Sequence, residues 1–262
     1  MRLEARELAF GYPGRPVGRD ASFALEAGEV ICLLGPNGSG KTTLFKTLLG
    51  LLPAQGGRVL LDNVELTRWP RAKLARAVAY VPQAQMGVFP YSVLDVVLMG
   101  RTAHLGPFGT PGAADREAAW AALQALRIDH LAQADYTRIS GGQRQLALIA
   151  RALAQAARIL VMDEPTASLD FGNQVLVLGH IRALAGRGIG VVLSTHAPDH
   201  AFACADRVIV LSEGRILAQG PPDAIVTTER LKEVYGVDVR VVRAPGLPRP
   251  VCVPELPAPQ IG

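Results

Sequence analysis

The sequence predicts an α/β protein in which helices cover an open, mostly parallel sheet. Four apolar runs each end in polar or glycine residues, and segments with helical spacing lie between them. The runs are apolar at successive positions, which is typical of strands buried on both faces. They comprise residues 30–34, 159–162, 191–193 and 208–211.

Other segments complete this α/β architecture. Alternating apolar residues within the first 27 positions predict antiparallel strands flanking a turn at Tyr12 to Gly14. The last apolar run continues through Gly214 into a predicted hairpin. Helical spacing replaces strand signals between about 84 and 156, which indicates a helical subdomain inserted into a core of about 1–83 and 157–243.

The end of the chain has a different composition. We expect irregular structure after Tyr235, and residues 244–262 hold six prolines among nineteen residues. Because proline-rich segments bury little apolar surface, we expect no packed element in this tail.

Composition excludes several protein classes. The chain of 262 residues is long enough for a buried core, yet it lacks the roughly 18 to 20 uninterrupted apolar residues of a membrane-spanning helix. Its three cysteines are scattered, and its N-terminus does not resemble a signal peptide. The net charge of +4 arises from 27 bases and 23 acids without a block of like charge. We therefore expect a cytoplasmic protein and no nucleic-acid partner.

A glycine-rich segment after the first strand fits G-x-x-x-x-G-K-[ST] and opens a predicted helix over residues 41–52. Glycines let successive backbone N–H groups point at phosphate oxygens, while the helix presents its positive end. Lys41 should reach the β- and γ-phosphates, and Thr42 should hold Mg²⁺. A plain glycine-rich turn would not need this strand and helix context. The predicted nucleotide contacts here are Gly35, Asn37, Gly38, Ser39, Gly40, Lys41, Thr42 and Thr43.

Two adjacent acids end the second strand. Neighbours on a strand point to opposite faces, so Asp163 can complete the Mg²⁺ ligands while Glu164 polarises the attacking water. The alternative is a helix-capping pair ahead of Pro165.

A second glycine-containing segment, Ser140-Gly141-Gly142-Gln143, precedes apolar residues at helical spacing. Its Ser-to-Gln spacing suits a capping box. A cap alone does not require the glycine pair, which costs about 1 kcal/mol per residue but exposes backbone N–H groups to an anion.

Residues 139–143, with Ile139 for the usual Leu, resemble the LSGGQ signature of ABC-type ATPases. Other motifs of that family follow its order over about residues 1–240. Tyr12 resembles the residue that stacks on adenine, Gln83 the glutamine loop, residues 168–170 the D-loop, and His196 the switch histidine.

The resemblance implies a P-loop ATPase that binds ATP and Mg²⁺ and carries out hydrolysis with Glu164, His196 and Gln83. It assigns Thr42, Gln83 and Asp163 to the metal. In this family ATP lies between two subunits, contacted by Lys41 of one and by residues 140–143 of the other, with Asp170 at the junction. The partner subunit is then a second copy or a paralogue, and we expect a homodimer bound to a transmembrane permease at the cytoplasmic face of the inner membrane. A periplasmic substrate-binding protein would act indirectly.

Residues 91–101, 144–155 and 231–237 are similar to the ATPases of bacterial importers for ferric siderophores, haem or cobalamin. Because none of these residues touches cargo, an importer for another cargo stays open. A DNA-repair or translation ATPase of the ABC type would usually carry two motif sets or a long coiled coil. A nucleotide kinase would lack residues 139–143 and His196.

Gln83 stands where the core passes into the helical subdomain. The segment after it combines methionine and aromatic residues with Gly87 and Pro90, which is typical of an apolar loop. We predict that residues 83–91 line the permease contact, because methionine adapts in shape and aromatics anchor interfaces. The alternative is that this loop buries itself.

Overall fold

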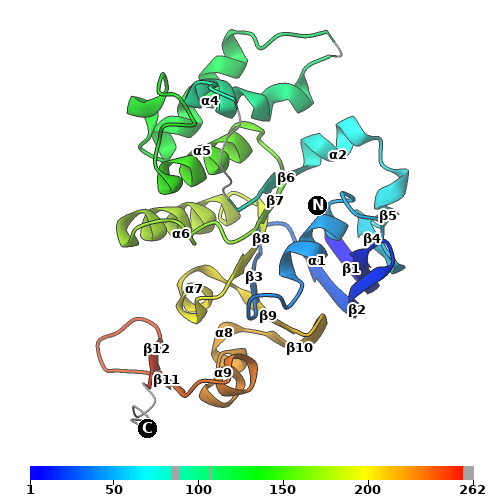
Figure 1. Ribbon diagram of the computed structural model, residues 1–262, viewed down its shortest axis with the longest axis vertical. Helices are drawn as coiled ribbons and strands as arrows, with labels where there is room; N and C mark the ends of the chain where they lie inside the picture. The colour runs from blue at the N-terminus through cyan, green and yellow to red at the C-terminus, as the bar shows by residue number, and fades with distance from the viewer. Residues whose placement is uncertain (84–88, 107, 256–262) are drawn as a thin grey trace.

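The computed structural model describes residues 1–83, 89–106 and 108–255. Its central sheet has six strands in the order β10-β9-β3-β8-β7-β6, all parallel except β10, which forms a hairpin with β9. The predicted α/β fold and the predicted hairpin at Gly214 are confirmed (Figure 1). The strands are β3 (Val30–Leu34), β6 (Val78–Val81), β7 (Ile159–Met162), β8 (Gly190–Thr195), β9 (Arg207–Ser212) and β10 (Arg215–Gly220).

Both faces of the central sheet are covered, as the continuous apolar runs predict. In β3, Ile31 and Leu33 pack with α1 (Lys41–Leu48), whereas Cys32 and Leu34 pack with the C-terminal helices. This alternation follows from the two-residue period of a strand. Helix α1 ends earlier than expected, because Gly50 turns into the left-handed conformation and the chain folds back on Lys46.

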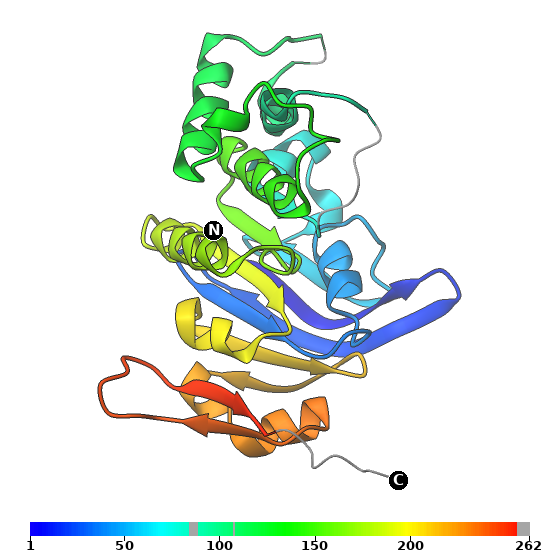
Figure 2. The same cartoon turned by 60° about the vertical axis from the view of Figure 1, so that its left-hand side comes forward.

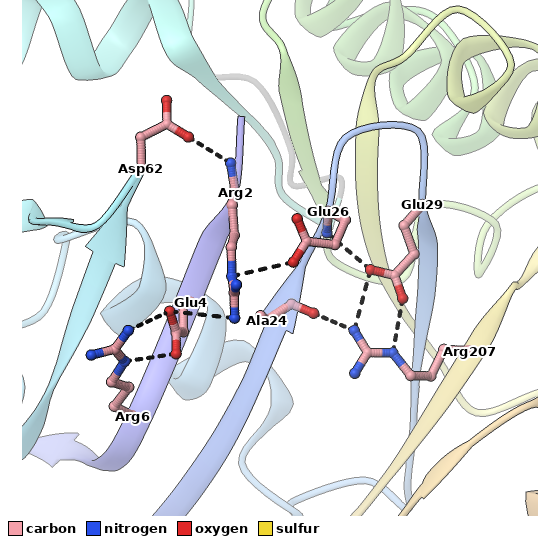
Figure 3. Close-up of polar contacts among 8 residues, drawn as sticks. All are labelled: Arg2, Glu4, Arg6, Ala24, Glu26, Glu29, Asp62 and Arg207. Carbon is pink, nitrogen blue, oxygen red and sulfur yellow. Dashed lines mark hydrogen bonds and ion pairs between the residues drawn. The ribbon is translucent and has the colours of Figure 1, made fainter.

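The N-terminal residues form a four-stranded antiparallel sheet in the order β2-β1-β4-β5, which confirms the predicted antiparallel strands. Polar contacts connect it to the core: Arg2 bonds Glu26, Glu26 N–H donates to Glu29, and Glu29 binds Arg207 of β9 at 2.8 Å (Figure 3). Arg207 also donates to the carbonyl of Ala24. The strands are β1 (Leu3–Tyr12), β2 (Arg15–Leu25), β4 (Gly56–Leu61) and β5 (Val64–Glu65).

Helices between β6 and β7 pack together at the top of Figure 1, as expected for a helical insertion. They share one apolar cluster with the β7 residues Leu160 and Met162 and with α6 (Phe171–Ala185). Short helices η1 (Leu66–Arg68) and α2 (Arg71–Ala77) precede β6. The inserted helices are α3 (Val93–Leu98), η2 (Met99–His104), α4 (Ala113–Ala125), η3 (Asp129–Leu131) and α5 (Gly141–Ala154).

The expectations of irregular structure after Tyr235 and of no packed element in the tail that begins at residue 244 are both wrong. Strands β11 (Val239–Val242) and β12 (Val251–Pro254) pair as an antiparallel hairpin, visible at the bottom of Figure 2. Alternate residues Val239, Val241 and Cys252 pack against α7 (Pro198–Cys204), α8 (Pro222–Ile225) and α9 (Thr228–Tyr235). Most prolines of residues 244–255 lie in the connection between β11 and β12, where no N–H is needed for the ladder. The proline content of the tail therefore gave no indication of the alternating pattern in the two strands.

None of the helices in the described part of the chain combines the length and apolar character needed to cross a bilayer.

Candidate nucleotide-binding site

A hollow of about 450 Å³ lies at the carboxyl edge of the central sheet, the edge at which open α/β sheets bind ligands. The structure brings together residues from β1, β2, the loop before α1, and the segments that follow β6 and β7. Its lining residues are Tyr12, Arg15, Val17, Asn37, Gly38, Gly40, Lys41, Thr42, Thr43, Gln83 and Glu164.

The loop before α1 needs its glycines at two positions for steric reasons. Gly40 caps the helix with a φ of 102°, a conformation that other residues rarely adopt. A Cβ at Gly35 would lie 2.2 Å from the carbonyl oxygen of Leu211, so only glycine fits against β9. The Gly214 N–H donates to the Ser39 carbonyl at 3.1 Å, which ties the loop to the β9–β10 hairpin.

Lys41 is only 6% exposed and forms part of the lining of the hollow. Its Nζ donates to the carbonyls of Gly35 and Pro36 at 2.8 and 3.0 Å and lies 3.7 Å from Glu164 Oε1. Burial lowers the pKa of Lys41, while the carboxylates of Glu164 and Asp163 act in the opposite direction. This places a cationic donor beside the loop N–H groups, as phosphate binding requires.

Asp163 is buried and accepts hydrogen bonds from two hydroxyls. Thr42 Oγ1 donates to its Oδ2 at 2.6 Å, and Ser194 Oγ of β8 donates to its Oδ1 at 2.7 Å. Burial, followed by the charge of Asp163, raises the pKa of Tyr80 on β6.

The hydroxyl and carboxylate oxygens of Thr42 and Asp163, with Gln83 in the same hollow, fit the hard-oxygen preference of Mg²⁺. Among the described residues there is no cluster of three acidic, histidine or cysteine side chains that could hold a metal by itself. A Mg²⁺ ion usually completes its ligands with substrate phosphates and water, so this donor set suits that ion.

Glu164, the residue after Asp163, has a φ of 46°, an uncommon backbone conformation for a non-glycine residue. Its N–H donates to Ser194 Oγ at 2.9 Å, and its Oε2 lies 3.4 Å from His196 Nδ1. Such strain persists where the surroundings impose it, often at functional sites. One carboxylate oxygen thus faces Lys41 and the other faces His196.

Tyr12 borders the hollow at the end of β1 and is 39% exposed. Gln55 Nε2 donates to its carbonyl at 2.8 Å. Sequence reasoning missed the neighbouring Arg15 and Val17. A signal was present, since the Tyr12-Pro13-Gly14 turn implies that β2 returns beside β1 and Arg15 pairs with Tyr12.

Residues 140–143 start α5 and do not line the hollow. Ser140 Oγ accepts from the Gln143 N–H at 3.2 Å, and Gln143 Oε1 accepts from the Ser140 N–H at 2.9 Å, a complete capping box. A Cβ on Gly142 would lie 3.0 Å from the Ser168 carbonyl. Asp170 caps α6 by accepting from the Asn173 N–H. The segments with Ser140 and Asp170 are therefore adjacent to each other but outside the hollow.

Gln83 reaches the hollow, whereas residues 84–88 of the predicted permease contact lie outside the described residues. Phe89 is 63% exposed and Tyr91 47% exposed, with their ring centroids 6.0 Å apart. These two rings are therefore not buried within this chain, contrary to the alternative that the loop buries itself.

Comparisons with known proteins agree with this arrangement. The sequence profile of the ABC transporter family matches residues 19–167. An uncharacterised ABC transporter ATP-binding protein of Haemophilus influenzae is 46% identical, over 90% of this chain and 89% of the relative. The hemin import ATP-binding protein HmuV of Myxococcus xanthus is 39% identical over 99% of both chains.

Solved structures agree as well. A metal-chelate type ABC transporter in an inward-facing conformation has a TM-score of 0.84 and 33% identity, over 97% of both chains. The ADP conformation of the ATP-binding cassette MJ1267 has a TM-score of 0.78 and 26% identity, over 90% of this chain and 98% of that one.

Proposed function

This chain belongs to the ABC transporter family of ATP-binding proteins, and from that premise we propose that it powers an importer for a metal chelate of the hemin class. The observation that carries the proposal is the hollow in which the loop before α1, Lys41 and Glu164 converge. The cargo class is supported by the hemin import relatives and by the metal-chelate transporter structure.

In this proposal, the N–H groups of residues 35–42 and the Lys41 ammonium hold the β- and γ-phosphates of ATP. Thr42, Asp163 and Gln83 hold Mg²⁺, which when bound neutralises charge on the phosphates. Tyr12 stacks against the adenine. These roles follow from the side chains that the hollow brings together.

Glu164 acts as the group that orients and polarises the attacking water. His196, 3.4 Å from Glu164 Oε2, holds that carboxylate and contacts the γ-phosphate. The left-handed backbone of Glu164 aims its side chain between Lys41 and His196. Proton abstraction and phosphate stabilisation are thereby assigned to different residues.

We assign residues 140–143 and Asp170 to the site of a second copy, because they lie outside the hollow of their own chain. The helix start of α5 offers N–H groups to an anion, which suits the γ-phosphate of a facing subunit. The working unit is then a homodimer with two composite sites at the cytoplasmic face of the inner membrane, bound to permease subunits and served by a periplasmic binding protein. A core of about 1–83 and 157–243, to which strand β12 adds residues up to 254, and a helical subdomain of about 84–156 suit this assembly.

Reconstitution tests the cargo. The chain, tagged and purified with the permease from its own host, is placed in proteoliposomes with Mg²⁺ and ATP on the side of the ATPase and with the cognate binding protein on the other side. We expect ATP-dependent uptake of hemin. ATP-dependent uptake of a ferric siderophore or cobalamin, without hemin, would contradict the hemin assignment while leaving the importer assignment intact.

A further inference from the structure

His200 of α7 stands between the two turns that carry the candidate catalytic residues. Its Nδ1 lies 3.0 Å from Thr195 Oγ1 and 3.4 Å from Thr166 Oγ1. Thr195 ends β8 immediately before His196, and Thr166 lies in the segment between Glu164 and Asp170. One imidazole nitrogen therefore contacts the loops that follow two neighbouring parallel strands.

Both threonine hydroxyls are buried, since each residue is 2% exposed. Buried hydroxyls need hydrogen-bond partners, and leaving one unpaired is costly. The Ala197 N–H donates to Thr195 Oγ1 at 3.1 Å, which leaves the Thr195 proton available for His200 Nδ1. Burial lowers the pKa of His200, with Asp199 opposing and His196 adding to the effect, which favours the neutral ring. In the tautomer that carries its proton on Nε2, Nδ1 accepts a hydrogen bond.

On the Thr166 side, further hydrogen bonds extend to the end of the turn. The Leu169 N–H donates to the Thr166 carbonyl at 3.1 Å, and Gln174 Nε2 donates to the Leu169 carbonyl at 3.1 Å. Asp170 follows and caps α6. The position of Thr166 therefore constrains the position of Asp170.

On the Thr195 side, the connection reaches the reacting groups. The backbone N–H of His200 donates to the Ala197 carbonyl at 3.2 Å, which closes the turn that follows His196. His196 in turn lies beside Glu164. The polar contacts thus run from Leu169, the neighbour of Asp170 in the chain, through Thr166 and His200 to Thr195, the neighbour of His196.

We propose that His200 is a positioning residue that sets His196 and Glu164 in one site according to the placement of the Asp170 turn. This inference rests on the proposed function, because it gives the junction between two copies a physical connection to hydrolysis. His200 is not among the residues that line the hollow. It acts through the hydroxyls of Thr166 and Thr195, and hydrogen-bonded networks of this kind define a single arrangement of the loops they join.

The test uses substitutions that separate the Nδ1 contact from ring volume. His200→Asn places an amide oxygen near the position of Nδ1, His200→Gln places its amide nearer to Nε2, and His200→Ala removes both. We expect kcat of ATP hydrolysis to fall about tenfold in the Ala and Gln variants and less than about threefold in the Asn variant. KM for ATP should change less than about twofold in all three, since His200 lies outside the lining of the hollow.

Two further variants keep the test decisive if His200→Ala is unstable. Thr195→Val and Thr166→Val preserve side-chain shape while removing the hydroxyl, and each should lower kcat. Combined with His200→Ala, Thr166→Val should add little further loss, because both changes break the same contact. His180→Ala on α6 serves as the control and should match the wild type.

Equal kcat in the Asn and Gln variants would overturn the role of Nδ1. If the decrease in kcat correlates with the decrease in melting temperature across the variants, His200 has a purely structural role instead. Wild-type protein without any ATPase activity would contradict the proposed function itself, whereas an active wild type with fully active His200 variants contradicts this inference alone.

Discussion

The two glycine-rich helix starts of this chain, residues 35–42 before α1 and residues 139–143 before α5, have different surroundings. Around the first, Lys41, Thr42, Asp163 and Glu164 converge from α1 and from the end of β7, where a hydrogen bond joins Thr42 to Asp163 and an ion pair joins Lys41 to Glu164. At the second, Ser140 pairs with Gln143 within the same turn, and the helix start lies outside the hollow. The first helix start is therefore accompanied by the candidate catalytic side chains of its own chain. The second has N–H groups suited to an anion but lies apart from those side chains, which is what a composite site between two copies requires.

The largest expected effect tests the first helix start. Replacing Glu164 by Gln removes the group that polarises water but preserves side-chain size, so ATP should still bind while turnover falls about 10²- to 10⁴-fold. The control is Glu7→Gln, because Glu7 shares the φ of 46° but lies outside the hollow. Near-normal ATPase activity of Glu164→Gln in the presence of its permease would remove Glu164 from the mechanism.

Mixing two damaged copies compares the helix starts directly. Lys41→Ala and Ser140→Arg proteins should each be inactive alone, because both sites of each dimer are damaged. Random pairing should leave about one site in four whole, so mixing should recover up to about a quarter of the wild-type rate. The measurement is ATPase rate against mixing ratio. If mixtures stay inactive although crosslinking shows heterodimers, either each site is built within one chain or both sites must be whole for any turnover.

A third test concerns the exposed rings beside Gln83. Phe89→Asp places a charge on a surface that we assign to the permease, so the complex should separate on co-purification while ATP affinity and melting temperature stay unchanged. Leu247→Asp is the control, since Leu247 is 50% exposed in the C-terminal hairpin. An intact complex would argue against the contact, and a large drop in melting temperature would show that Phe89 is needed for folding.

The smallest expected effect separates capping from ATP binding at the second helix start. Ser140→Ala removes a cap worth about 1 kcal/mol, which should lower the melting temperature by about 2–4 °C. Ser92→Ala should cost about the same, because Ser92 forms an equivalent capping box on α3. Only Ser140→Ala should also lower the ATPase rate of the dimer. Equal ATPase rates in the two variants would show that Ser140 only caps α5 and does not contribute to ATP hydrolysis.

Much of the core could be predicted because its signals are local. Residues 30–34 and 159–162 are strands with the predicted bounds, since a parallel strand buried on both faces must be apolar throughout. Strand β6 was missed because its four residues follow α2 without a break, so the pattern is too short to distinguish from the helix. The hairpin of β11 and β12 was missed because proline content outweighed two short alternating runs.

In the candidate site, glycines at positions where no other residue fits could be predicted directly from the sequence. Gly35 and Gly40 are required by a close backbone approach and a left-handed φ, and the motif around Lys41 is contiguous along the chain. Arg15 and Val17 were not predicted: the turn at Tyr12 to Gly14 places β2 beside β1, but which β2 side chains reach the hollow depends on the register of the two strands.

The sequence by itself determined the alternation of strands and helices, the phosphate-binding loop and the acid pair, because each depends on neighbours within a few residues. Only the tertiary structure decided that Thr42 meets Asp163, that Glu164 lies between Lys41 and His196, and that Thr166 and Thr195 share His200. These contacts join residues far apart in the chain, such as Thr42 and Asp163 at 121 positions. They form because parallel strands bring their carboxyl ends to one edge of the sheet, and local sequence patterns do not encode which side chains meet there.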